Sequence, residues 1–131
     1  MRVGLACLAD RATVEALGNK LNVSGIFDRI HAQSFPAVHA SMALVIRVMF
    51  EYEDGNKSHR LAVTLRDADG KEYQKLNADI KAGPLEPGAS VSVNQIIEIQ
   101  GAVFAKPGRY HFGLKADDED EVRVPLELAQ I

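Results

Sequence analysis

The sequence predicts an all-β protein, an antiparallel sandwich of about seven or eight strands. Apolar and polar residues alternate in most segments, which is the period of a half-buried strand. Turn residues such as Asp-Gly and Pro-Gly separate these segments. No segment keeps a helical period over the roughly 11 residues that an amphipathic helix needs. The 131 residues suit one domain, residues 1–131, because a chain of this length buries roughly two-thirds of its unfolded surface.

The amino-terminal segment predicts two strands. Apolar or small residues share one parity in the first strand: Val3, Leu5, Cys7 and Ala9. We therefore expect Cys7 to face the core as a small hydrophobic residue and not to act as a nucleophile. Leu21, Val23 and Phe27 indicate the second strand, and residues 12–17 have room for one helical turn.

The central segment predicts a hairpin followed by a further strand. Residues 44–52 and 60–66 alternate in the strand period and are joined by a turn at Asp54 and Gly55. After a second turn at residues 67–70, Tyr73 is out of phase with the strand that follows. We expect a β-bulge near Gln74.

The carboxyl-terminal third predicts one long strand and a terminal hairpin. Residues 91–99 alternate after a loop rich in glycine and proline. Residues 110–114 and 122–128 then form the clearest pair in the sequence. Pro125 lacks an N–H donor, so it favours an edge or a bulge in the last strand. The acidic turn between them, residues 117–121, lacks the glycine and ligand spacing of an EF-hand and is expected to be solvated.

Several short stretches carry a resemblance. The ending Pro107-Gly108-Arg109-Tyr110-His111-Phe112, with its following turn and strand, resembles the final hairpin of immunoglobulin-like β-sandwich domains. The stretches 5–10, 18–28, 35–39 and 94–96 resemble a family of short bacterial proteins known only as a domain of unknown function. The resemblance implies a cytoplasmic bacterial β domain with an immunoglobulin-like fold, and it assigns no activity, substrate or site.

Composition narrows the classes of function. The formal net charge is −3, and no two Lys or Arg residues are adjacent, which argues against a nucleic-acid footprint. There is no Trp and no basic amphipathic helix, so base stacking and membrane-surface binding are not expected. The single cysteine excludes an intramolecular disulfide, so we expect a reducing, cytoplasmic environment.

One cluster of polar residues is a candidate site: Asp28, His31 and His39 lie within twelve positions. Phe35 and Pro36 stand between the two histidines. Two histidines and a carboxylate fit a metal-dependent enzyme if a third ligand joins. However, Pro36 breaks the single straight strand that would align the two imidazoles. We expect a corner at which the chain passes between sheets, with Phe35 and Val38 plugging the end and the histidines bonding to the backbone.

Apolar residues on the outward parity are the most informative anomaly: Val45, Met49, Ala62 and Ile96. Either the amino-terminal segment covers them or they form a partner surface. We expect a non-catalytic binding or assembly module that binds a protein partner or a second copy through a sheet face, with no cofactor, metal or catalytic residue.

Two alternatives remain. One is a small-molecule or carbohydrate-binding sandwich that uses the loops around His39 and Gly83 to Gly88. The other is the metal-dependent enzyme using Asp28, His31 and His39.

Overall fold

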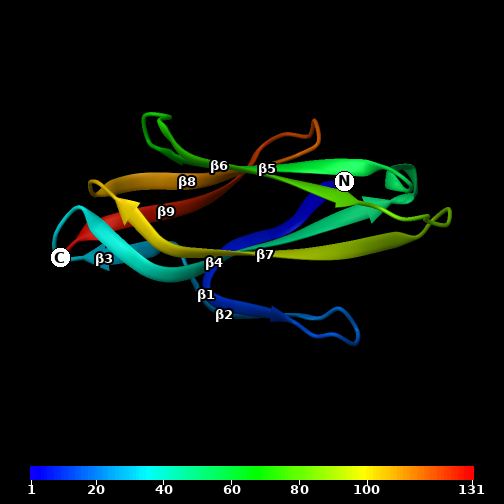
Figure 1. The fold of residues 1–131 in the computed structure, drawn as a ribbon, viewed down its shortest axis with the longest axis horizontal. Helices are drawn as coiled ribbons and strands as arrows, with labels where there is room; N and C mark the ends of the chain where they lie inside the picture. Colours follow the sequence, from blue (N-terminus) through cyan, green and yellow to red (C-terminus); the bar gives the residue numbers. More distant parts are fainter.

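The computed structural model describes residues 1–131 and folds them into two packed β-sheets (Figure 1). The four-stranded sheet has the order β2-β1-β4-β7, and the five-stranded sheet has the order β3-β9-β8-β5-β6. The strands are β1 (Arg2–Val14), β2 (Leu21–Phe27), β3 (Arg29–Ala32), β4 (Ala37–Glu51), β5 (Ser58–Asp67), β6 (Glu72–Lys81), β7 (Ser90–Phe104), β8 (Gly108–Ala116) and β9 (Val122–Gln130). The only helical segment is the three-residue 3₁₀ helix Tyr52–Asp54.

The all-β sandwich predicted from the sequence is confirmed. The structure adds a ninth strand, the four-residue β3, which is too short to show an alternation of its own. It pairs parallel with β9, so the sandwich is not purely antiparallel. No helix has the length and apolar character needed to span a lipid bilayer.

The predicted hairpin between residues 44–52 and 60–66 is wrong. β4 lies in the four-stranded sheet and β5 in the five-stranded sheet, so the connection crosses between the sheets. The 3₁₀ helix and the residues after it span this crossing, and alternation alone does not say which sheet a strand joins. The terminal hairpin is present, with β8 paired to β9. The bulge is also present, because the β5–β6 register shifts beside Gln74.

β1 reverses the predicted facing of its residues. Its register with β4 shifts between Val3 and Leu5, and beyond this bulge Ala6 and Leu8 pack into the main core. Cys7 therefore points to the outer side of the sheet, where it is half-buried. The predicted helical turn at residues 12–17 is also wrong, because β1 continues to Val14 and pairs with β2 up to that residue.

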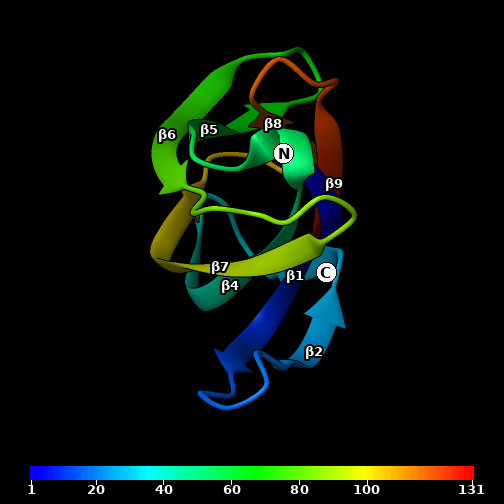
Figure 2. The ribbon, with the colours of Figure 1, turned by 90° about the vertical axis from the view of Figure 1, so that its right-hand side faces the viewer.

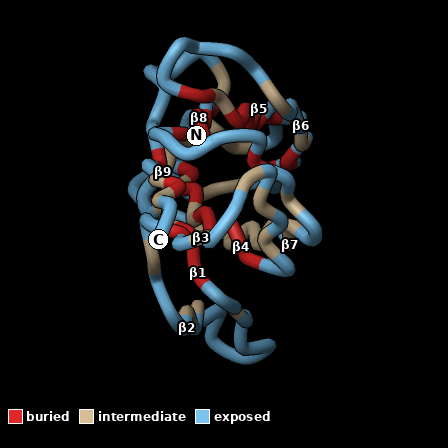
Figure 3. Tube along the Cα trace, turned by 90° about the vertical axis from the view of Figure 1, so that its left-hand side faces the viewer, coloured by how far each residue is buried: buried red, intermediate tan, exposed pale blue.

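The β1–β2 hairpin lies on the outer side of the four-stranded sheet, away from the five-stranded sheet (Figure 2). Beneath it, Ala43 and Val45 of β4 are completely buried. Leu21 and Val23 of the hairpin pack against them. Figure 3 shows that the buried residues lie mainly between the sheets and that the hairpin tip is exposed.

Residues 27–37 form the expected corner. The chain leaves the four-stranded sheet after β2, enters the five-stranded sheet as β3 and returns as β4. The backbone oxygen of Asp28 accepts a hydrogen bond of 2.8 Å from the Glu127 amide, and Ile30 lies in the main core. Phe35 packs against the core as expected, whereas Val38 is 68% exposed and plugs nothing. We call this side, where β1 and β3 adjoin β9, the closed flank.

Candidate functional site

The opposite side of the sandwich is open. β6 is the edge strand of the five-stranded sheet on this side, and β7 is the edge strand of the four-stranded sheet. No further strand lies between them. A groove of about 360 Å³ lies between these two edges. Its floor is apolar and includes Leu44, Val63 and Phe112 of the main core. We call this side the open flank.

The rims of the groove come from the two edge strands. β6 contributes Gln74, Lys75 and Leu76, and β7 contributes the segment from Ile97 to Gln100. Leu76 is 47% exposed although its register position places it on the inner side of the sheet. A large apolar side chain half in water at the mouth of an apolar groove is a feature of partner surfaces.

The two edge strands differ in their charge. Among the ten residues of β6, the charged ones alternate in sign: Glu72, Lys75, Asp79 and Lys81. Among the fifteen residues of β7, only Glu98 is charged, and the strand contains no lysine or proline. Charge and proline are the usual devices that keep an exposed edge from pairing with another strand. β7 has no proline and a single charge, so its edge is poorly protected against pairing with a further strand.

The four expected interface residues do not form one accessible surface. Val45 is completely buried under the β1–β2 hairpin, and Ile96 packs against the same cluster. Met49 is half-buried, and its Sδ accepts a hydrogen bond of 3.0 Å from the Ser92 hydroxyl. Ala62 lies on the other sheet, opposite Asn77 of β6. The sheet face expected to bind a partner is covered at Val45 by the chain's own hairpin.

Side-chain hydrogen bonds hold the hairpin in place. The Asn19 side chain donates to the backbone oxygen of Ser92 at 2.9 Å, and the Asn94 amide donates to Asn19 Oδ1 at 3.0 Å. Asn19 has a φ of +52°, a left-handed conformation that asparagine tolerates better than most residues. The tip of the hairpin is thus tied to the first half of β7.

Asp28, His31 and His39 do not form a site. His31 is exposed on β3, while His39 is half-buried on β4 with its ring 5.8 Å from that of Phe27. Neither imidazole makes the backbone hydrogen bond that the sequence led us to expect, and Nε2 of His39 is buried without a partner. No group of three or more His, Cys, Asp or Glu side chains is arranged to hold a metal ion.

The loops of the proposed carbohydrate site are also far apart. His39 lies near the start of β4, whereas Gly83 accepts a hydrogen bond from Asn56, in the turn after the end of that strand. Fifteen residues of strand span roughly 50 Å, so the two places lie at opposite ends of the sandwich. The groove at the open flank is lined by neither.

Sequence analysis missed an ionic cluster at one end of the sandwich. The buried His59 ring contacts Asp117 Oδ2 at 2.7 Å through Nδ1 and the backbone oxygen of Asp54 at 2.8 Å through Nε2. The α-amino group of Met1 lies 2.6 Å from Asp54 Oδ1. Burial opposes ionisation of Asp117, but the hydrogen bonds from His59 and the Arg60 amide outweigh it and lower the pKa of Asp117. Both ring nitrogens of His59 are hydrogen-bonded within the protein, so we interpret the cluster as stabilising the fold and not as a reactive site.

A second ionic cluster lies on the outer face of the five-stranded sheet. The Glu121 carboxylate contacts Arg66 at 2.9 Å and Arg123 at 3.3 Å, directly above Gly113. A Cβ at Gly113 would lie 2.6 Å from the Glu121 carboxyl carbon, so glycine makes room for this pairing. Both ends of the acidic turn, Asp117 and Glu121, therefore make ion pairs, and the residues between them are exposed as expected.

The cysteine also has no reactive setting. Cys7 is half-buried beside the hairpin, and burial raises the pKa of its thiol. A raised pKa lowers the thiolate fraction, the opposite of what an activated nucleophile needs.

Comparison with known proteins gives a family but no activity. The model of a family of unknown function, DUF6941, matches residues 4–129. No curated protein matches the chain.

Proposed function

The chain belongs to the DUF6941 family of unknown function, and we propose that it is a non-catalytic assembly module that binds an extended protein strand along its open flank. One observation carries the proposal: an edge strand of fifteen residues with a single charge, Glu98, borders an apolar groove. A bound strand would add its backbone hydrogen bonds to β7 and place alternate side chains in the groove, the mode called β-augmentation.

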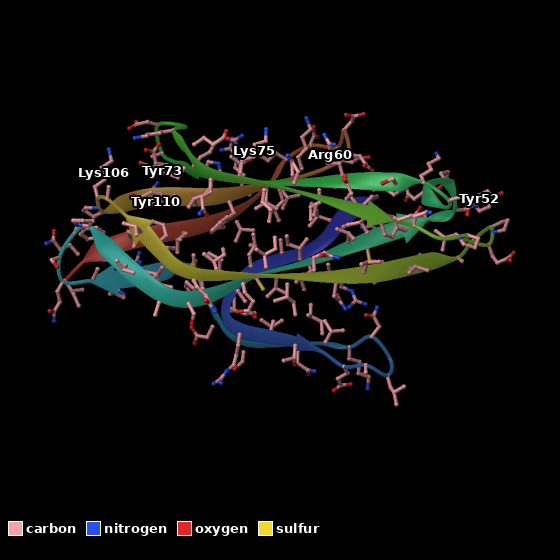
Figure 4. The ribbon with its side chains drawn as sticks, viewed as in Figure 1. Tyr52, Arg60, Tyr73, Lys75, Lys106 and Tyr110 are labelled. Carbon is pink, nitrogen blue, oxygen red and sulfur yellow. The ribbon has the colours of Figure 1, made fainter.

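The proposed ligand class is protein and not nucleic acid or membrane. The basic side chains on the outer face of the five-stranded sheet are interleaved with acidic partners, as in the pairs of Arg66 with Glu121 and Arg29 with Glu127. Figure 4 shows Arg60 and Lys75 on this outer side, and Asp79 lies 3.7 Å from Arg60. Interleaved charge gives no continuous basic patch for phosphates.

An immunoglobulin-like fold in a bacterial cytoplasm is part of the same proposal. Two features support the fold: β8 lies between β5 and β9, and the Tyr110 hydroxyl donates a hydrogen bond of 2.7 Å to the backbone oxygen of Lys106. A tyrosine that bonds back to the preceding turn is typical of immunoglobulin-like sandwiches. The single cysteine supports a reducing compartment.

In-cell photo-crosslinking tests the proposal. Benzoylphenylalanine placed at Gln100, an exposed residue on the β7 rim, should give one discrete covalent adduct with a protein segment. The same probe at Lys115, exposed on β8 at the outer face of the five-stranded sheet, serves as the control and should give none. Equal labelling at both positions, or none at Gln100, contradicts a strand-binding flank.

A further inference from the structure

We propose that the strand bound at the open flank belongs to a second copy of this chain, paired antiparallel about a two-fold axis close to Asn77 of β6 and Ile97 of β7. This inference rests on the proposed function and names its partner. Such an interface is isologous, because each copy contributes the same surface.

The charges of β6 are self-complementary under this symmetry. Read along the strand, their signs are negative at Glu72, positive at Lys75, negative at Asp79 and positive at Lys81. Reversing the strand turns this order into its opposite. About an axis at Asn77, Glu72 of one copy falls opposite Ala82 of the other and Lys81 opposite Tyr73, so no like charges face each other. Centred on Asn77, Lys75 of one copy lies opposite Asp79 of the other, and this pair occurs twice. Parallel pairing in the same register would set like charges against each other.

β7 permits the same arrangement. A two-fold axis through a strand must pass through one residue, so that inward side chains meet inward side chains. An axis at Glu98 would place two carboxylates opposite each other, which disfavours that register. An axis at Ile97 places Glu98 opposite Ile96 of the copy and leaves no charged pair along β7.

The two proposed symmetry centres, Asn77 of β6 and Ile97 of β7, lie at opposite rims of the same groove. Leu76, the neighbour of Asn77, and Ile97 both line it. The two edge strands run in opposite directions, because Tyr73 at the start of β6 and Phe104 at the end of β7 both contact the Tyr110 ring, with ring centroids 5.9 and 5.1 Å apart. Because the two centres face each other across the same groove, one axis perpendicular to both strands serves both, and the two grooves adjoin across it.

The proposed pairing buries the apolar side chains and backbone groups that are exposed at the open flank of a single copy. The half-exposed Leu76 of each copy meets the groove of the other, and the unpaired backbone groups of each β7 find partners. β6 and β7 then cease to be free edges.

Sedimentation equilibrium over a concentration series tests the inference. The wild-type protein should approach twice the 14.3 kDa mass of the chain. Lys75→Glu should weaken the dimer about tenfold, because two symmetry-related attractive pairs become repulsive. Lys115→Glu makes the same charge change on an exposed position of β8 and should leave the dimer unchanged. Asp79→Lys should weaken it as Lys75→Glu does.

The decisive step is to mix the two weakened variants. A heterodimer of Lys75→Glu with Asp79→Lys restores both opposite-charge pairs, so the mixture should associate more tightly than either variant alone. This recovery also shows that both variants are folded. A monomer at every concentration, or a mixture no tighter than its components, overturns the self-pairing. A Gln100 cross-link to a different protein would overturn it while leaving the strand-binding function intact, whereas loss of every cross-link removes both.

Discussion

The two flanks of the sandwich differ in whether the chain covers the gap between the sheets. On the closed flank, residues 27–37 cross between the sheets, and β3 extends the five-stranded sheet beside β9. On the open flank, β6 and β7 end without a neighbour, and core residues such as Leu44 and Phe112 form the floor of a groove. The chain thus supplies its own cover on one side only.

The difference between the two flanks indicates where a partner would bind. Pro125 lies on β9 just before the parallel pairing with β3 begins at Glu127, so a residue without an N–H donor occupies the part of β9 that pairs with β8 alone. β7 has no comparable device over its fifteen residues. A long edge strand with as little protection as β7, beside an apolar groove, is one that we expect to be paired in use.

The largest expected effect lies on the closed flank. Ile30→Ala removes a side chain that is 9% exposed and packs in the main core on β3. Deleting buried methylene groups there should lower the free energy of unfolding by about 2–4 kcal/mol, measured by urea denaturation. A loss below about 1 kcal/mol would mean that the corner contributes little to the core.

The matching change on the open flank should cost much less in dilute protein. Leu76→Ala shortens a side chain that is already 47% exposed, so we expect a loss of less than about 1 kcal/mol. The same variant should weaken self-association in the sedimentation series. If Leu76→Ala destabilises the monomer as much as Ile30→Ala, the groove is a packed part of the core and the contrast between the flanks fails.

Sequence patterns predicted contacts between neighbouring segments. They missed contacts between residues that are far apart in the sequence. The β8–β9 hairpin was predictable because both partners alternate and lie on either side of one short turn. The sheet assignment of β5 was not, because alternation is the same in either sheet. Outward Val45 was recognised as anomalous, yet nothing in its own strand shows that Leu21 and Val23, on a hairpin earlier in the chain, cover it.

The same limit applies to the polar residues. His59 and Asp117 are 58 positions apart, and their contact follows from the fold and not from spacing. Asp28, His31 and His39 are close in sequence, but the corner turns them to different surroundings. Closeness along a chain that changes sheets twice is weak evidence of a shared site.

The turn that starts β6 should make stability depend on pH. Asp67 accepts hydrogen bonds of 2.9 Å from the Asp69 and Lys71 amides and from the Tyr73 hydroxyl. Desolvation opposes ionisation, but these bonds outweigh it and lower the pKa of Asp67. Its contribution is therefore complete above the unfolded pKa of about 3.9 and is lost as pH falls through the lower folded value.

Asp67→Asn tests this dependence on the edge strand of the open flank. The variant should melt below the wild type at pH 7, and the difference should shrink as the pH falls below about 4. Tyr73→Phe removes only the hydroxyl bond and should show a smaller loss with the same trend. A difference in melting temperature that stays constant from pH 7 to acid would contradict a role for the ionised carboxylate.

The smallest effect concerns the hairpin that covers the four-stranded sheet. Asn19→Gly removes the side-chain bonds to Ser92 and Asn94 while keeping a residue that tolerates the left-handed backbone. Because these bonds are exposed, the loss should be about 0.5–1 kcal/mol. Asn56→Gly is the matched control: Asn56 has a φ of +58° and its side chain makes no hydrogen bond, so it carries only the backbone effect. Amide exchange in β1 and β2 should quicken in Asn19→Gly alone. Equal exchange in both variants would show that the hairpin is held by Leu21 and Val23 against Val45, and not by its tip.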